Sequence, residues 1–243
     1  APAPLEAPRA YLYSVTEFID GQTLRQWMAD NPQPSLEQVR DIVEQIVKGL
    51  RPFHRREMLH QDIRPENIMI TDDGVVKLID FGSAYVAGVQ EAAPFPEEAG
   101  ILGTYQYTAP EYFSNEPVSF RSDMFSVGVV AYEMLTGYLP YGTQVAKVRT
   151  PRDRTALRYR NANNDERAIS KWIDEALLRA VHADPIKRYA TFSDFIKDLR
   201  TPSTAYQKRH ARPLMERDPL KFWQGLSFAL AILCVVLAAQ LSK

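Results

Sequence analysis

The stretch that most constrains the fold is HQDIRPENIMITDDGVVKLIDFG, residues 60–82. Two short runs rich in β-branched and apolar residues flank Asp73-Gly74, a pair typical of the tight turn of a β-hairpin. If those two residues form the loop, position 67 faces position 80, so Asn67 and Asp80 meet at the open end of the hairpin. Amide and carboxylate oxygens are ligands that Mg²⁺ accepts in proteins. The hairpin therefore predicts a magnesium site formed by Asn67 and Asp80.

Two further side chains of the same stretch suit phosphate chemistry. Asp62 lies in the segment that leads into the hairpin, near the metal pair but not part of it, where its carboxylate can accept a proton from a hydroxyl group. Arg64 supplies a cation for a phosphate group. The competing interpretation is a surface hairpin with acidic ends, which would account for any one of these residues taken alone. Their joint pattern favours the site.

The bulk composition leaves room for one or two ordinary hydrophobic cores and excludes some partners. Of the 243 residues, 45% are apolar and 24% are charged, and the formal net charge is -1. A dedicated nucleic-acid binder needs a strong basic excess, so we expect no nucleic acid as a partner. The single cysteine, Cys234, excludes an internal disulfide and is consistent with a reducing compartment.

Outside the opening stretch the patterns are mostly helical. Residues 1–10 are a Pro/Ala-rich, flexible lead-in, and the aromatic and β-branched run at 10–19 predicts a strand. A long helix is predicted to begin at Ser35, where Gln38 completes a capping box and an apolar face follows. Helical patterns dominate from 122 to 200. The sequence thus predicts a mainly α fold with a small β-hairpin, of the α+β class.

A long uncharged segment near the C-terminus predicts a membrane anchor. Residues 222–242 carry no charge, and Lys221 and Lys243 bracket them. This is about the length that a helix needs to cross roughly 30 Å of hydrocarbon. The alternative is a buried C-terminal helix, although such a helix normally keeps a polar face. We therefore predict a transmembrane helix over 222–242 that contacts membrane lipid, after a basic juxtamembrane linker at 201–221.

The charges on either side of this segment predict its orientation. Several basic side chains precede it and only Lys243 follows it. By the positive-inside rule, the large N-terminal part stays in the cytoplasm. We expect a single-pass C-terminal anchor in the inner (plasma) membrane, with the catalytic part cytoplasmic.

Several motifs occur in an order that points to one family. HQDIRPEN is followed by DFG, then by GTYQYTAPE, SDMFSVGVVAYEMLTGYLPY and DPIKRY. Over residues 11–200 this arrangement resembles the protein kinase family, whose catalytic loop and DFG triplet have these spacings. The loop and the GTYQYTAPE segment are more similar to the serine/threonine branch than to the tyrosine branch. The resemblance implies the hinge and the large C-terminal lobe of a kinase domain.

The resemblance also implies roles for the residues already singled out. Asp62 would orient the acceptor hydroxyl as the catalytic base, and Asn67 and Asp80 would hold Mg²⁺. Arg64 stands where the family usually has lysine, near the γ-phosphate of ATP. Thr104 would hydrogen-bond toward Asp62 and shape the groove for a protein substrate.

A second set of residues would form the adenine side of the ATP site. The VTEFI run resembles the hinge, with Thr16 as gatekeeper and the backbone of Glu17 and Ile19 facing adenine. Met69 would lie beneath the adenine ring, and Asp80 would complete the cofactor site through its metal. ATP and Mg²⁺ are the implied cofactors.

Other matching residues would brace the large lobe. His60 and Phe81 are expected to stack, and Asp123 is expected to bind the backbone of the catalytic loop. Glu111 and Arg188 are expected to form a buried ion pair. These would serve as core or bracing residues even in an inactive relative.

Besides Arg64 in place of lysine, the chain departs from the family in two larger ways. None of its eleven glycines lies in a G-x-G arrangement, and no lysine precedes Lys48, so a Gly-rich loop and a strand lysine are both missing. We expect a truncated domain that lacks most of its small N-terminal lobe and is inactive alone. The arginine that normally precedes the catalytic aspartate is Gln61, and residues 86–100 contain no Ser, Thr or Tyr. We therefore expect activity that does not depend on phosphorylation of that loop.

Three functional hypotheses follow. The first is a membrane-anchored protein serine/threonine kinase that transfers the γ-phosphate of ATP to a protein hydroxyl. The second is a kinase-like scaffold or pseudokinase that binds partners without catalysis. The third, a small-molecule phosphotransferase of the aminoglycoside-kinase type, is disfavoured by the peptide-substrate segment GTYQYTAPE. The compact loops are also similar to bacterial kinases fused to an upstream phosphatase domain, so such a domain is a candidate partner in the parent chain.

Overall fold

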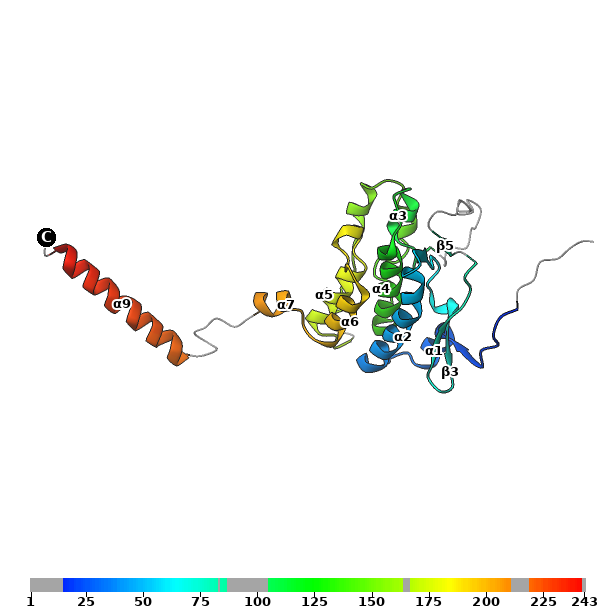
Figure 1. Cartoon of the computed structure of the whole chain (residues 1–243), viewed down its shortest axis with the longest axis horizontal. Helices are drawn as coiled ribbons and strands as arrows, with labels where there is room; N and C mark the ends of the chain where they lie inside the picture. The colour runs from blue at the N-terminus through cyan, green and yellow to red at the C-terminus, as the bar shows by residue number, and fades with distance from the viewer. Residues whose placement is uncertain (1–14, 83, 87–104, 164–166, 211–218, 242–243) are drawn as a thin grey trace, which may run out of the picture.

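The computed structural model describes residues 15–82, 84–86, 105–163, 167–210 and 219–241 (Figure 1). Its α-helices are α1 (Leu24–Asp30), α2 (Leu36–His54), α3 (Pro110–Phe113), α4 (Phe120–Thr136), α5 (Lys171–Ala180), α6 (Phe192–Arg200), α7 (Thr204–Arg209) and α9 (Pro219–Leu241). Its strands are β1 (Gly21–Thr23), β2 (Met58–Leu59), β3 (Ile68–Thr71), β4 (Val76–Leu78) and β5 (Tyr85–Val86). Short 3₁₀ helices are η1 (Pro65–Asn67), η2 (Val145–Lys147), η3 (Asp153–Ala156) and η4 (Pro185–Lys187).

Helix α2 begins where the sequence predicts. The Gln38 amide donates to Ser35 Oγ at 3.2 Å, and the Ser35 amide donates to Gln38 Oε1 at 2.9 Å. This reciprocal pair satisfies two amides that a helix N-terminus leaves without intrahelical partners. The apolar face is buried as predicted, and its buried members are Val39, Ile42, Val43, Ile46, Val47 and Leu50.

Helix α4 is the centre of the helical body. Its side chains are buried on all sides from Ser122 to Tyr132, because α2 packs on one side and α5 on another, while α6 contacts both α2 and α5 (Figure 1). Gly128 permits the close approach of α5, since a Cβ atom there would lie 2.9 Å from the Cβ of Ala180. The structure therefore confirms the mainly helical prediction and places the helical body around one buried helix.

The β structure is larger than the predicted hairpin. Strands β1, β3 and β4 form an antiparallel sheet in that order, and β2 pairs with β5 in a second, two-stranded sheet. The strand predicted at 10–19 is wrong over its described part, because residues 15–20 have no regular structure and β1 begins at Gly21. Val15 and Phe18 are each 88% exposed, so the apolar residues that suggested a strand do not pack into a sheet.

The loop of the hairpin holds three residues rather than two. Ile70 pairs with Val76, and inside that pair the Thr71 amide donates to the Val75 carbonyl at 3.0 Å, which leaves residues 72–74 as the loop. The Gly74 amide donates to the Thr71 carbonyl at 2.8 Å, and Gly74 has φ of 77°. A three-residue loop of this kind ends with a residue in the left-handed region, which glycine adopts without a steric penalty.

The longer loop shifts the register at the open end by one residue. The Ile79 amide donates to the Asn67 carbonyl at 3.0 Å, so Asn67 is level with Ile79 and Asp80 lies one position beyond. The prediction that positions 67 and 80 face each other across the ladder is therefore wrong. Asp80 has φ of 60°, a left-handed conformation that aspartate tolerates better than most residues.

The prediction of a transmembrane helix over 222–242 is also wrong. Among the residues that the structure describes, no helix has both the length and the apolar character that a membrane crossing requires. Helix α9 covers residues 222–241 of the segment, and the polar residues Gln224 and Ser227 lie in its first half, among the side chains that the structure describes. The lipid contact and the membrane localisation inferred from that segment lose their support.

Candidate active site

The catalytic loop is fixed to the helical body by one carboxylate. The amides of His60 and Gln61 donate to the two oxygens of Asp123, each at 3.1 Å, and His54 Nε2 lies 2.7 Å from Asp123 Oδ2. Asp123 is 1% exposed, so these bonds form away from water and hold the loop against the first turn of α4. The predicted contact between Asp123 and the loop backbone is confirmed, and His54 is a further partner.

Asp62 and Asn67 are brought together at the start of the hairpin. The Asn67 side-chain nitrogen donates to Asp62 Oδ2 at 2.6 Å and to the Asp62 carbonyl at 3.0 Å. Asn67 is the last residue of η1, which carries it back toward Asp62 before β3 begins. Both side chains are half-buried. Two of the predicted site residues are therefore in direct contact, and each constrains the orientation of the other.

Asp80 follows β4 and is exposed. Its Oδ1 accepts a hydrogen bond from the Gly82 amide at 3.1 Å. No cluster of three or more His, Cys, Asp or Glu side chains is placed to hold a metal ion in the described part of the chain. The predicted magnesium pair consists of one Asn and one Asp, so its role in metal binding stays a prediction.

Phe81, the middle residue of the DFG triplet, belongs to an aromatic cluster. The rings of His60 and Phe81 are 5.3 Å apart between centroids but inclined at 60°, so they are in contact without being parallel. The stacked partner of Phe81 is Phe53 from the end of α2, at 5.0 Å and 26°. The predicted stacking of His60 on Phe81 is therefore wrong, although the two rings are close, and Phe53 was not anticipated from the sequence.

The hinge-like segment lies beside the sheet that carries Met69. Glu17 forms an ion pair with Lys77 of β4, and Lys77 is the register partner of Met69 on β3. Thr16 and Glu17 are exposed, whereas Ile19 and Met69 are half-buried. The structure therefore brings the segment that holds three predicted adenine contacts close to the strands that hold the fourth. Their contacts with a nucleotide stay a prediction.

Arg64, which was predicted to lie near the γ-phosphate, shares the Glu66 carboxylate with Arg25. Its Nε donates to Glu66 Oε2 at 2.8 Å, and Arg25 Nε donates to the other oxygen of Glu66 at 2.9 Å. Burial would raise the pKa of Glu66, but the bonds from Arg64 and Arg25 outweigh it and lower that pKa to about 2. The sequence reasoning missed Arg25 and Glu66, and Thr104 lies outside the described residues.

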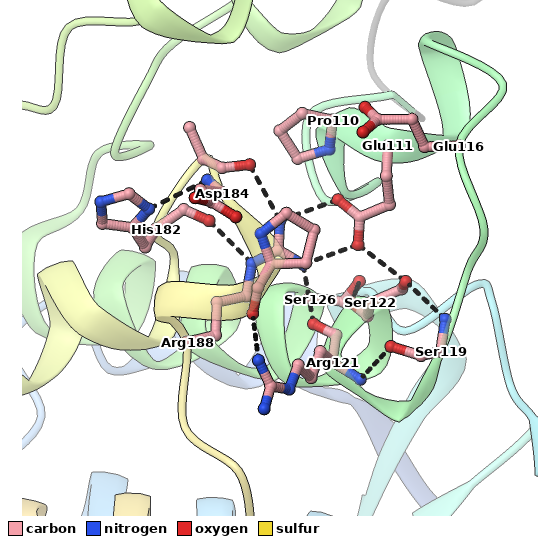
Figure 2. A network of polar contacts seen from close by, with 12 residues as sticks. Pro110, Glu111, Glu116, Ser119, Arg121, Ser122, Ser126, His182, Asp184 and Arg188 are labelled. Carbon is pink, nitrogen blue, oxygen red and sulfur yellow. Dashed lines mark hydrogen bonds and ion pairs between the residues drawn. The ribbon is translucent and has the colours of Figure 1, made fainter. Parts of the chain in front are cut away.

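A buried ion pair joins α3 to the residue that follows η4. Arg188 Nη1 and Nη2 donate to the two carboxylate oxygens of Glu111 at 2.7 and 2.8 Å, as Figure 2 shows. Ser122 Oγ donates to Glu111 Oε1 at 2.7 Å, and the guanidinium also donates to the carbonyls of Arg121 and His182. Both charged side chains are at most 1% exposed. The predicted pair is confirmed.

Comparison with known proteins decides the family. The sequence matches the protein kinase domain over residues 6–199, which is most of the chain. The chain belongs to the protein kinase family. The Glu111–Arg188 ion pair, the loop held by Asp123 and the aromatic cluster around Phe81 are thus parts of a kinase domain.

The similar proteins are bacterial serine/threonine kinases. The domain is 33% identical over 228 residues to the probable serine/threonine-protein kinase PknB of Bifidobacterium longum, which covers 85% of this chain and 31% of that protein. It is 33% identical over 196 residues to the serine/threonine-protein kinase PknB of Mycobacterium leprae, covering 77% and 30%. It is 27% identical over 206 residues to the serine/threonine-protein kinase PrkC of Bacillus subtilis, covering 85% and 31%. The chain spans less than a third of the length of these relatives.

The buried histidine of the kinase domain predicts a pH-dependent stability. Burial lowers the pKa of His60 below its ordinary value of 6.5, although Asp123, Asp62 and Asp80 oppose the shift. Because the unfolded chain binds a proton that folded His60 does not, the stability from this group is complete above about pH 6.5 and declines as the pH falls. His60→Phe keeps a ring in the cluster and is expected to flatten that decline, as measured by urea unfolding between pH 5 and pH 8.

Two other histidines matter for this experiment: His182 is expected to contribute to the pH dependence of stability, and His210 provides the control. Burial also lowers the pKa of His182, so part of the decline is expected to persist in His60→Phe. His210 is exposed, and His210→Gln should keep the slope of the parent chain. Equal slopes for His60→Phe and the parent would contradict the assignment of the effect to His60.

Proposed function

We propose that this domain is the acceptor-side part of a protein serine/threonine kinase. In the proposed reaction, the oxygen of a Ser or Thr hydroxyl forms a bond to the γ-phosphorus of ATP. The bond between that phosphorus and the β,γ-bridging oxygen breaks, ADP leaves, and the hydroxyl proton passes to the Asp62 carboxylate. The observation that carries the proposal is the contact between Asp62 and Asn67 on a loop held by Asp123.

The donor set fits a hard cation. The side-chain nitrogen of Asn67 donates a hydrogen bond to Asp62, which leaves the side-chain oxygen of Asn67 as the atom suited to coordinate Mg²⁺. The exposed Asp80 offers a carboxylate. When bound, Mg²⁺ would neutralise charge on the phosphates. Asn67 would orient Asp62 and Asp62 would hold the acceptor proton. Arg64, with Glu66 fixing its direction, would contribute positive charge near the γ-phosphate.

The adenine side of the site is proposed to lie along the hinge-like segment. Thr16, Glu17 and Ile19 would contact the nucleotide from one side, and Met69 from the other. The Glu17–Lys77 ion pair supports this arrangement because it holds that segment against the sheet. Thr104 would help to position the protein substrate.

A specific observation favours the scaffold alternative for these 243 residues taken alone. They contain neither a G-x-G loop nor a lysine before Lys48. Phosphoryl transfer depends almost entirely on positioning and electrostatic stabilisation, so the loss of those parts is expected to remove it. An upstream phosphatase domain stays a prediction, which the sequence of the complete gene tests.

The experiment compares this chain with the full-length gene product. With ATP labelled at the γ-phosphate and Mg²⁺ present, we expect the gene product to label serine or threonine of acceptor proteins and EDTA to abolish the labelling. The 243-residue chain alone is expected to transfer negligible label and to bind ATP weakly by calorimetry. A gene product that binds ATP but labels no acceptor would contradict the kinase proposal and support the scaffold. Ordinary turnover by the 243 residues would contradict the predicted dependence on the missing parts.

A further inference from the structure

One guanidinium group joins three parts of the site that are distant in sequence. Arg25 lies in the first turn of α1, whereas its partners belong to the catalytic loop, to α4 and to the segment before α3. These partners, Glu66, Glu133 and Tyr107, lie 41, 108 and 82 residues from Arg25 along the chain. No other role in the proposed reaction uses Arg25.

Each contacting nitrogen of Arg25 has a different partner. Nε donates to Glu66 Oε1 at 2.9 Å, and Nη1 donates to Glu133 Oε1 at 2.9 Å. Nη2 donates to the Tyr107 hydroxyl, and that hydroxyl donates to the second oxygen of Glu133. Arg25, Glu133 and Tyr107 therefore form a closed ring, and Glu66 extends it to Arg64.

The ring is sheltered from water on the side of α4. Tyr107 is 3% exposed and the Glu133 side chain is 12% exposed. Burial, together with the charge of Glu133, raises the pKa of the Tyr107 hydroxyl, so this group stays protonated and donates a hydrogen bond to the Glu133 carboxylate. Arg25 supplies the cation that pairs with the partly buried carboxylate of Glu133. Arg25, Tyr107 and Glu133 thus each hydrogen-bond to the other two, and the charge of Arg25 balances that of Glu133.

The ring connects the two sides of an acceptor site. Glu66 immediately precedes Asn67, so its position sets where the catalytic loop enters β3. Tyr107 belongs to the segment that leads into α3, and its carbonyl also accepts from Ser126 of α4 at 2.8 Å. We propose that Arg25 is a positioning residue that holds the catalytic loop in register with the Tyr107 segment. The role in catalysis rests on the proposed kinase function, whereas the role in ordering the two segments does not.

The proposal requires arginine rather than any cation. The planar guanidinium presents several donors in fixed directions, whereas a lysine ammonium is one point charge on a flexible stem. Arg25→Lys can therefore satisfy one partner at a time but cannot reach all three together. Partial rescue by lysine is the signature that separates this arrangement from a simple charge requirement.

The primary test measures local order in the purified chain. Arg25→Met keeps the aliphatic stem and removes the donors, and hydrogen exchange is followed in peptides that cover 62–67 and 105–109. We expect exchange in both segments to become about tenfold faster, with Arg25→Lys intermediate. The matched control is Arg40→Met, because Arg40 is also partly buried and binds the Leu199 carbonyl at 2.6 Å and Glu37 at 3.0 Å, in the contact between α2 and α6. That variant should leave both segments unchanged.

Three results would overturn the proposal. They are unchanged exchange in Arg25→Met, a uniform increase over the whole chain like that of a general loss of stability, and full rescue by Arg25→Lys. In a full-length gene product shown to be active, Arg25→Met should lower kcat at least tenfold with less than a twofold change in KM for ATP. Unchanged kcat there would overturn the catalytic part. If the gene product has no kinase activity, the exchange result still decides the ordering role.

Discussion

Asp62→Asn is expected to lower kcat for phosphate transfer by the full-length gene product by about 10²–10⁴-fold, the contribution typical of a positioned general base. The amide of asparagine keeps the shape of the carboxylate but cannot take the acceptor proton. It can still accept the bond from the Asn67 nitrogen, so the loop is expected to stay in place. Steady-state assays with labelled ATP give kcat, and calorimetry gives the affinity for ATP, which should change little.

The control for this prediction is Asp72→Asn. Asp72 is an exposed carboxylate at the tip of the same hairpin, so the variant makes the same chemical change away from the loop. It should retain the parent rate. A loss of less than tenfold in Asp62→Asn would contradict the assignment of Asp62 as the base.

Arg188→Met is expected to reduce the free energy of unfolding by about 3–5 kcal/mol, because it leaves the Glu111 carboxylate buried without its cation. The same change removes the donors to the carbonyls of Arg121 and His182. The measurement is equilibrium unfolding in urea. Glu111→Leu combined with Arg188→Met should cost less than the sum of the two single changes, since neither partner is then left charged alone.

Arg200→Met is the matched control for burial. Arg200 pairs with three carboxylates, Glu37, Asp41 and Glu44, but its side chain is 41% exposed. Water screens such pairs, so this variant should lose much less stability than Arg188→Met although it breaks more ion pairs. Equal losses in the two variants would contradict the importance of burial at Glu111 and Arg188.

The features that were predictable from the sequence have local causes or follow from the family. The capping box of Ser35 and Gln38 is set by residues three apart, and the buried face of α2 follows from helical periodicity. The Glu111–Arg188 pair and the Asp123 contact were inferred from the kinase resemblance, not from spacing. The structure confirms both.

The predictions that were wrong concern geometry that the residue types alone do not determine. Two-residue and three-residue loops both accept Gly74 in a left-handed conformation, so the turn sequence could not decide the register that places Asp80. The apolar residues at 15–18 suggested a strand but lie in an exposed irregular segment. Hydropathy alone likewise suggested a membrane span that the described part of α9 does not support.

The Arg25 ring had no sequence signal. Its members are separated by tens of residues, and each is of a type that is common on protein surfaces. Only the packing of α1 against η1 brings Arg25 to Glu66. A network of this kind becomes visible when the tertiary structure is known.

Because the catalytic loop is attached to α4 through Asp123, the proposed acceptor side and the proposed adenine side of the kinase domain are held by different parts of the fold. The acceptor side is anchored in the helical body, whereas the hinge-like segment is tied to the small sheet through Glu17 and Lys77. If residues 15–19 contact the nucleotide as proposed, their redesign is expected to alter the choice between ATP and bulky ATP analogues and to preserve the geometry for the incoming hydroxyl. On the proposed function, an engineered allele that accepts only such an analogue would let the protein substrates of the proposed kinase be tagged inside a living cell.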